Sequence, residues 1–375
     1  MRKLLQRLML VVFSFTLMLV MLEIGLRIYL NEQGTENQRV LYLYSREEIN
    51  ERATRFEGVA FLNYRLSPTY DQNNSLGYRG PEITVPKPAG VYRIVALGGS
   101  STYGEFINDW QDSYPAQLES LLRTEYGYEH VEVINAGVPG YTSWESAANF
   151  MFRVLDLEPD MVIIYHAIND VNPRLTDPAT YDGLFAWHGY WDDYDEPLPV
   201  STLYRFVKVR LFDWQPTVTR GLDRHFVSSG DYRACGLEIQ GDQAYCANLD
   251  MAAEDVLAAN PPVYFERNIR NIISVAQTNN IDVLLSSWAY SPHEFDRPGG
   301  DFLSIPFRQN AVDEHNAVLR QLGDEQPVLF FDLAAVMPQE QNYWVDGMHV
   351  NRRGAAEQAR FYAEFLDEAG VISAP

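Results

Sequence analysis

The chain has 375 residues, and 46% of them are hydrophobic, so it can form a sizeable core and is not globally disordered. Its 51 acidic and 29 basic residues give a formal net charge of −22. This balance argues against a nucleic-acid partner, which would require a basic face to meet phosphates.

The N-terminal segment, residues 1–30, predicts a membrane anchor. Residues 1–7 are basic, and residues 8–22 carry no charge. As a helix, residues 8–30 would extend roughly 34 Å, which is enough to cross the hydrocarbon core of a bilayer. Glu23 and Arg27 are four residues apart, so they can pair on one helix face near the interface. The basic flank should stay in the cytoplasm, which places the rest of the chain on the extracytoplasmic side, periplasmic or extracellular.

A cleaved signal peptide is the alternative for this segment. No small-x-small cleavage site follows the apolar run, because Leu22 is followed by Glu-Ile-Gly-Leu-Arg-Ile-Tyr. We therefore expect an uncleaved, single-pass anchor in the cell membrane. Both cysteines, Cys235 and Cys246, follow this anchor and could form a disulfide in an oxidising compartment. Two reduced thiols are the alternative.

The rest of the chain divides into a polar lead-in and an α/β region. Residues 31–90 are expected to form a stalk and a lead-in segment. From residue 91, short apolar segments alternate with helical ones, which predicts a parallel sheet with helices on both faces. The expected strands are residues 93–97, 131–134, 161–165, 281–286 and 328–331, and the expected helices are residues 114–126, 144–155, 263–278, 305–322 and 355–369. An insertion at about 172–262, aromatic-rich and without a clear strand, interrupts the alternation.

A glycine- and hydroxyl-rich loop, Gly98-Gly-Ser-Ser-Thr-Tyr-Gly104, follows the first expected strand. Ligands bind at this end of the strands in open parallel sheets. The loop is not a phosphate-binding loop, because Glu105 and Phe106 occupy the positions that require Lys and Ser/Thr. It matches neither the dinucleotide fingerprint nor the G-x-S-x-G elbow. Its glycines allow a sharp turn that leaves Ser100 at the strand end as a candidate nucleophile.

Residues suited to assist a serine nucleophile follow the later strands. Gly137 can bring its N–H close to a bound carbonyl, and Asn169 can donate its side-chain amide to an oxyanion. Near the C-terminus, Asp346 and His349 are three residues apart around a glycine. A tight turn there would bring the carboxylate to Nδ1 of the imidazole and direct Nε2 toward Ser100.

These four blocks resemble the SGNH (GDSL-type) hydrolase family from about residue 92 to the C-terminus, apart from the insertion. The anchor and residues 74–80 are similar to a bacterial membrane-tethered branch. The resemblance implies a flavodoxin-like, three-layer α/β/α sandwich with a five-stranded parallel sheet over residues 91–375, preceded by one transmembrane helix. It also implies site residues, with Ser100, Asp346 and His349 as the catalytic residues and Ser100, Gly137 and Asn169 as the oxyanion hole.

The resemblance further implies a serine esterase that hydrolyses an O-acyl ester, O-acetyl included, through an acyl-serine intermediate. The expected substrate is an acylated small molecule, or a polysaccharide or lipid of the cell envelope or the extracellular space. An O-acyltransferase acting on a polysaccharide and a catalytically silent carbohydrate-binding protein are the alternatives. The sequence departs from the family pattern at Gly99, where the family has Asp, and at Ala167, where it has Gly. Neither departure removes a catalytic group.

Several other polar residues have simpler interpretations. Ser101 and Thr102 are alternative nucleophiles, but the family match favours Ser100. His166 is expected to be a packed, hydrogen-bonded histidine, and Asp170 a cap of a helix or loop.

Two sequence clusters could suggest a metal site. Neither shows paired ligands at firm helical spacing and no HExxH occurs, so we expect solvated polar loops, no metal and no cofactor. The clusters are His188 with Asp192 and Asp193, and His293 with Glu294 and Asp296. The sequence leaves the oligomeric state open.

Overall fold

The computed structural model describes residues 2–34, 38–39, 42–45, 55–59, 61–184, 200–212, 235–240, 243–296 and 302–372. The chain forms two compact units. The first unit combines Met1–Glu57 with Tyr190–Val227, and the second combines Gly58–Gly189 with Ser228–Pro375. Part of the expected insertion thus groups with the N-terminal segment, and most of the expected lead-in groups with the α/β region. The chain passes between the units within β1 (Phe56–Val59), which pairs with β2 (Leu62–Leu66).

The second unit contains the predicted five-stranded sheet, in the order β10–β9–β5–β3–β4, with every neighbouring pair parallel. All five predicted strands are present. Their bounds are β3 (Tyr92–Gly98), β4 (Val131–Gly137), β5 (Met161–Tyr165), β9 (Asp282–Ser286) and β10 (Leu329–Phe331). The neighbouring strands β5, β3 and β4 end at the segments that carry Asn169, Ser100 and Gly137, respectively.

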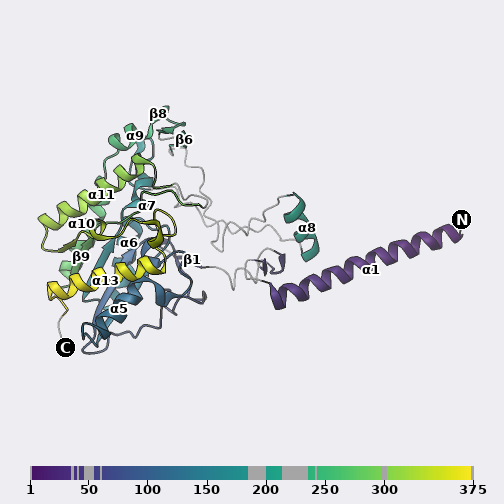
Figure 1. Cartoon of the computed structure of the whole chain (residues 1–375), viewed down its shortest axis with the longest axis horizontal. Coiled ribbons are helices and arrows are strands. Elements are labelled where there is room, and N and C mark those ends of the chain that lie inside the picture. Colours follow the sequence, from purple (N-terminus) through teal and green to yellow (C-terminus); the bar gives the residue numbers. More distant parts are fainter. Residues whose placement is uncertain are drawn as a thin grey trace. The chain divides into compact units, whose positions relative to one another are not determined.

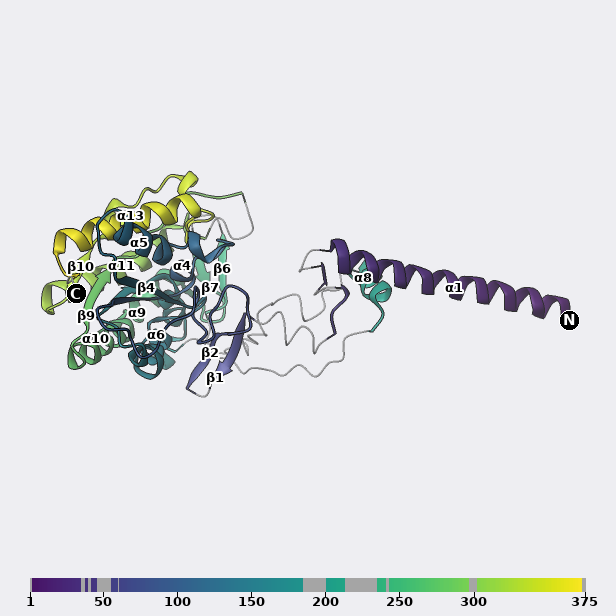
Figure 2. The same ribbon diagram turned by 90° about the horizontal axis from the view of Figure 1, so that it is seen from below.

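Helices cover both faces of this sheet, which confirms the three-layer architecture. Figure 2 shows α5 and α13 on one side of the sheet and α6 and α10 on the other. The main helices of this unit around the sheet are α5 (Tyr114–Thr124), α6 (Ser143–Asn149), α10 (Val263–Thr278), α11 (Pro306–Glu325) and α13 (Arg352–Ala369). The helix predicted over residues 144–155 is less regular than expected, because α6 continues as a π turn (Phe150–Val154) and a 3-10 turn (Leu155–Leu157).

The interior strand β3 shows why the core has two halves. Its seven residues are all buried. Ile94 and Ala96 belong to the hydrophobic cluster that includes α5 and α13, while Val95 and Leu97 belong to the cluster that includes α6 and α10. Alternate side chains of a strand point to opposite faces, so a continuous apolar run is what a strand buried on both sides requires.

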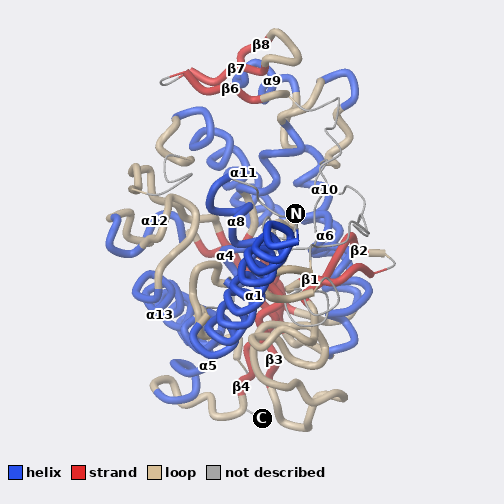
Figure 3. Tube along the Cα trace, turned by 90° about the vertical axis from the view of Figure 1, so that its right-hand side faces the viewer, coloured by secondary structure: helices blue, strands red, loops and turns tan. Residues whose placement is uncertain are grey.

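The insertion contains structure that the sequence analysis missed. β6 (Leu237–Gln240), β7 (Gln243–Cys246) and β8 (Met251–Ala252) form an antiparallel sheet beside α9 (Ala253–Ala259), as Figure 3 shows. The expectation of no clear strand in this region was wrong, because strands of two to four residues give no apolar run long enough to recognise. A disulfide joins Cys235 to Cys246 at this small sheet.

The first unit contains α1 (Arg2–Gln33) and α8 (Thr202–Phe212), which lies beside the C-terminal part of α1 (Figure 1). Among the described residues, α1 is the one helix long and apolar enough to cross a membrane. Its side chains over residues 3–22 are all exposed. The remaining helices are short: α4 (Ser100–Tyr103), α7 (Ile168–Val171) and α12 (Leu333–Val336), with 3-10 turns at Trp110–Asp112, Asn172–Arg174, Pro178–Thr180 and Gln341–Tyr343.

Candidate active site

Ser100 is the first residue of α4, directly after β3 and the linking Gly99. The turn is tight enough to exclude a side chain at Gly98, where a Cβ would lie 2.0 Å from Oγ1 of Thr102 and 2.9 Å from the Tyr165 carbonyl oxygen. Ser101 and Thr102 are buried, and Ser100 is partly exposed. The sequence therefore positions Ser100 at the carboxyl end of the interior strand β3, where this residue is partly exposed.

The structure brings Ser100, His349 and Asp346 together in one hydrogen-bonded chain. Nε2 of His349 lies 2.8 Å from Oγ of Ser100, and Nδ1 lies 2.9 Å from Oδ2 of Asp346. His349 and Asp346 are 8% and 5% exposed, so both are shielded from bulk water. The ring of Phe106 packs edge-on against the imidazole, with 5.2 Å between the ring centroids. This arrangement can transfer a proton from the serine hydroxyl to the imidazole.

A turn around Gly347 sets the relation between Asp346 and His349. The N–H groups of Met348 and His349 both donate to Oδ1 of Asp346, at 2.8 Å each. A Cβ at Gly347 would lie 2.9 Å from the Ser291 carbonyl oxygen, so the turn approaches its neighbour closely. Burial raises the pKa of Asp346, but the hydrogen bond and charge of His349 and the two N–H donors outweigh it and hold that pKa below its ordinary value. The carboxylate is therefore ionised while it holds the imidazole.

Asn169 lies in α7, directly after β5 and close to the nucleophile turn at Gly99. Its Nδ2 donates to the carbonyl oxygen of Tyr141 at 2.9 Å, which leaves its second amide hydrogen for another acceptor. A Cβ at Gly99 would lie 2.7 Å from this Nδ2. In this structure a side chain at Gly99 would therefore require the Asn169 amide to shift.

Gly137 does not have the free N–H that its predicted role requires. This N–H donates to Oδ1 of Asn135 at 3.0 Å. A Cβ at Gly137 would lie 2.3 Å from the Tyr103 nitrogen, so the glycine is needed for packing beneath α4. Gly140 lies further along the same loop with φ of 84°, and its N–H has no hydrogen-bond partner among the residues that the structure describes. It directly precedes Tyr141, the residue that accepts the Asn169 hydrogen bond.

Arg79, which the sequence analysis did not single out, holds the end of the nucleophile helix. Its guanidinium is buried and donates to the carbonyl oxygens of Tyr103, Gly104 and Ile107 at 2.8, 2.9 and 2.5 Å. It also lies over the Tyr103 ring, 4.3 Å from the centroid. The lead-in segment therefore helps to position Ser100. The sequence signal was limited to a basic residue within residues 74–80, the stretch that resembles the membrane-tethered branch.

His166 and Asp170 form a buried polar group behind the site. Nε2 of His166 is 2.7 Å from Oγ of Ser146, and burial lowers the pKa of His166 to about 4. Asp170 accepts hydrogen bonds from the N–H and hydroxyl of Ser143, the first residue of α6, as a cap should. Burial raises the pKa of Asp170 to about 7. These contacts agree with the expectation that His166 is a packed, hydrogen-bonded histidine and that Asp170 is a cap.

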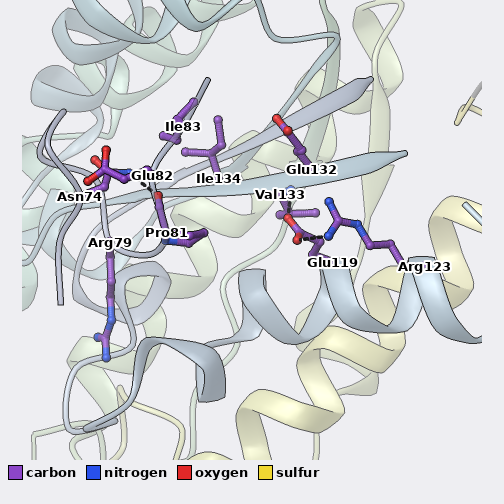
Figure 4. A pocket seen from close by; sticks show the side chains of 10 residues that line it. All are labelled: Asn74, Arg79, Pro81, Glu82, Ile83, Glu119, Arg123, Glu132, Val133 and Ile134. Atoms are coloured by element: carbon purple, nitrogen blue, oxygen red, sulfur yellow. Dashed lines mark hydrogen bonds and ion pairs between the residues drawn. The ribbon is translucent and has the colours of Figure 1, made fainter. Parts of the chain in front are cut away.

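A separate cavity of about 230 Å³ lies along the edge strand β4 (Figure 4). Glu119 and Arg123 form an ion pair in its wall, 2.8 Å apart. None of the residues of the serine site except the supporting Arg79 lines this cavity, and Figure 4 shows the Arg79 side chain pointing away from Glu119. The cavity is therefore distinct from the candidate active site.

The two clusters considered as metal sites have different outcomes. His188, Asp192 and Asp193 lie outside the described residues. Within the described part of the chain, which includes His293, Glu294 and Asp296, no group of three acidic, histidine or cysteine side chains is arranged to hold a metal ion.

The sequence model of the GDSL-like lipase/acylhydrolase family matches residues 96–225. This range includes Ser100, Gly137 and Asn169 and ends before Asp346 and His349. No curated protein matches the chain.

The chain is also similar to several solved structures. It is 17% identical to the lipase/acylhydrolase from Enterococcus faecalis, with a TM-score of 0.43 over 74% of this chain and 97% of that chain. It is 18% identical to an acetylxylan esterase from Geobacillus stearothermophilus, with a TM-score of 0.41 over 76% and 97% of the two chains. It is 16% identical to a GDSL-like lipase from Bacteroides thetaiotaomicron, with a TM-score of 0.38 over 74% and 88%. At these values the similarities do not bear on the substrate.

The family match covers the nucleophile block and the two blocks that follow it along the chain. The five-stranded parallel sheet places these blocks at the ends of neighbouring strands. The C-terminal Asp-x-x-His pair meets the serine of the first block. Residues 96–225 thus match the GDSL-like lipase/acylhydrolase family, and the folded chain brings together the serine, histidine and carboxylate that an SGNH (GDSL-type) ester hydrolase requires.

Proposed function

We propose that Ser100 attacks the carbonyl carbon of an ester and forms an acyl-serine intermediate. Nε2 of His349 accepts the Ser100 proton and then donates it to the leaving alcohol, while Asp346 holds the imidazole tautomer and stabilises its cation. Water, activated by the same imidazole, then releases the acid and regenerates the hydroxyl. The observation that carries this proposal is the continuous chain of contacts at 2.8 and 2.9 Å from serine to carboxylate.

The proposed oxyanion donors are the N–H of Ser100, the side chain of Asn169 and the N–H of Gly140. Gly140 replaces Gly137 in this role, because the Gly137 N–H is already bonded to Asn135. Preorganised donors of this kind contribute about 10²–10³ each to turnover. An Asn169→Ala variant should therefore lose activity in this range while it keeps its fold.

The proposed substrate is an O-acyl ester, such as an O-acetyl group, on a polysaccharide or lipid of the cell envelope or the extracellular space. We further propose that α1 anchors the chain in the cell membrane with a single pass and that the serine site faces the extracytoplasmic side. The basic residues before the apolar segment favour this orientation. The disulfide between Cys235 and Cys246 fits an oxidising compartment.

A hydrolysis assay on the purified full-length chain in detergent tests the reaction. It compares soluble esters of increasing acyl length with acetylated polysaccharides, and a Ser100→Ala variant supplies the background. We expect wild-type hydrolysis well above that background. Equal rates in both proteins would contradict the proposal, and acyl transfer to a glycan without bulk hydrolysis would identify an acyltransferase.

A fusion assay tests the orientation. A reporter that is active only outside the cytoplasm, fused after Pro375, should be active, and the protein should remain in the membrane fraction. Recovery of a soluble chain that begins near Asn31 would instead show that the N-terminal segment is a cleaved signal.

A further inference from the structure

The first unit carries a second feature suited to a membrane, which is helix α8. α8 begins at a carboxylate of α1. Oε1 of Glu23 accepts the N–H of Thr202 at 2.9 Å, and Oε2 accepts the N–H of Leu203 at 2.7 Å and the hydroxyl of Ser201 at 2.9 Å. The N–H groups of Thr202 and Leu203 belong to the first turn of α8, which leaves them without partners inside the helix. An acidic side chain of the membrane-anchor helix therefore caps α8.

Arg27 completes this junction. It pairs with Glu23 at 2.7 Å, as the sequence predicted, and donates to the carbonyl oxygen of Val200 at 2.5 Å. Glu23 is the first charged residue after the charge-free segment 8–22. The attachment point of α8 is thus at the level where the hydrocarbon core of the bilayer would end.

An apolar stripe of α8 is exposed in the structure. Tyr204, Val207 and Leu211 are three and four residues apart, so they lie on one helix face. Leu211 is 73% exposed, Tyr204 49%, and the preceding Val200 87%. The stripe borders an apolar groove of about 630 Å³ between the two helices. The groove is lined by Thr16, Leu19, Val20, Glu23, Ile24, Arg27, Val200, Ser201, Leu203, Tyr204 and Val207.

The charge of α8 is opposite to that of the chain. The helix contains Arg205, Lys208 and Arg210 and no acidic residue, whereas the chain has a net charge of −22. Arg205 is buried and donates to the carbonyl oxygen of Tyr44. Lys208 and Arg210 lie near the aromatic rings of the same helix, with Lys208 Nζ 5.3 Å from the Tyr204 centroid. Basic side chains next to an exposed apolar stripe are typical of helices that lie in the interface of an anionic membrane.

We propose that α8 is an interfacial helix that lies in the headgroup region of the bilayer that α1 spans. Its stripe and the groove take lipid acyl chains, and Lys208 and Arg210 contact anionic phospholipid headgroups. The proposal rests on the membrane anchoring by α1 proposed above. Its consequence is that the chain meets the bilayer at two places, the spanning helix and a helix of the insertion.

Single cysteine labels test this on the full-length chain, because the two native cysteines form a disulfide. Leu211→Cys reports on α8, Phe15→Cys on the middle of α1, and Glu368→Cys on an exposed position of α13. Each variant carries an environment-sensitive nitrobenzoxadiazole dye and is placed in phosphatidylcholine vesicles with or without phosphatidylglycerol. Lipids brominated along the acyl chain then quench any dye that contacts the bilayer.

We expect quenching at positions 15 and 211 and none at position 368. Quenching at 211 should increase with phosphatidylglycerol, and a Lys208→Gln/Arg210→Gln background should remove that increase. If the dye at position 15 is quenched but the dye at position 211, like the one at 368, is not, the α8 proposal alone is overturned. No quenching at 15 would overturn the anchor and the α8 proposal together. If quenching at position 211 does not change with the phosphatidylglycerol content, the proposed contact of Lys208 and Arg210 with anionic headgroups is contradicted.

Discussion

The hydroxyl of Ser101 donates a hydrogen bond to the carbonyl oxygen of Met348, 3.1 Å away. The bond joins the residue after the candidate nucleophile Ser100 to the residue before the candidate base His349. The nucleophile segment and the segment of the base, almost 250 positions apart in the sequence, are thereby joined directly. The hydroxyl that supports the site and the hydroxyl that would react are thus adjacent in the sequence and have different partners.

This difference predicts unequal effects of two neighbouring substitutions. Ser100→Ala should reduce kcat/KM for a soluble ester by several orders of magnitude, since it removes the nucleophile. Ser101→Ala should remove one hydrogen bond worth about 1 kcal/mol, which corresponds to less than about tenfold in rate. Steady-state kinetics of both variants check this. Equal losses would mean that the assignment of the nucleophile is wrong.

Asp346 and His349 should act as one unit. Asp346→Asn should keep the fold but favour the wrong imidazole tautomer, with a loss of up to about 10⁴ in turnover. His349→Ala should remove the base, and the double variant should be little worse than His349→Ala alone. A double-mutant cycle on kcat measures this. Strictly multiplicative losses would place the base elsewhere.

The pH dependence of hydrolysis should distinguish His349 from His166 as the catalytic base. Hydrolysis requires a neutral base, so kcat/KM should rise with pH through one ionisation. Burial lowers the pKa of His166 to about 4, so this side chain is neutral above that pH and should not contribute an ionisation at higher pH. The pH–rate profile of His166→Gln should therefore keep the wild-type midpoint. Loss of the ionisation in this variant would make His166 the base.

His166 should instead affect stability. Its folded pKa is lower than its ordinary value of 6.5, so the unfolded chain binds more protons between about pH 4 and 6.5. The free energy of unfolding of the wild type, measured relative to His166→Gln, should therefore rise with pH across that window. The comparison with the variant is needed because Asp170, with a raised pKa, contributes a slope of opposite sign.

Arg79 should support the nucleophile without taking part in the chemistry. Arg79→Lys keeps the charge, but one ammonium cannot reproduce the fork that reaches three carbonyl oxygens. We expect a loss of about 1–3 kcal/mol in the free energy of unfolding and slower phosphonate labelling of Ser100 in the folded protein. Arg153→Lys is the matched control, since Arg153 holds the same lead-in segment at Leu76. A normal labelling rate in Arg79→Lys would limit Arg79 to a role in stability.

The sheet and the order of the site blocks could be predicted because they depend on local patterns. A strand buried on both faces is a continuous apolar run, as β3 is, and the ends of parallel strands meet at one edge. Helix α8 could not be predicted in this way, because its first turn is capped by Glu23, almost 180 residues earlier in the chain.

The choice between Gly137 and Gly140 was also beyond the sequence. Both glycines suit a close approach of the backbone, and the Gly137 N–H is occupied because of where the Asn135 side chain lies. The burial of Arg79 likewise could not be predicted from the sequence. It depends on the path of the lead-in segment beneath α4, which no periodic pattern encodes.

The most direct measurement is the identification of the labelled residue by mass spectrometry after reaction with a serine-directed phosphonate. The contact between Nε2 of His349 and Oγ of Ser100 predicts one adduct, on the peptide that contains Ser100. Labelling should disappear in Ser100→Ala and slow strongly in His349→Ala, while both proteins remain folded by circular dichroism. An adduct on another residue, or undiminished labelling of the Ser100→Ala protein, would contradict the assignment of Ser100 as the nucleophile.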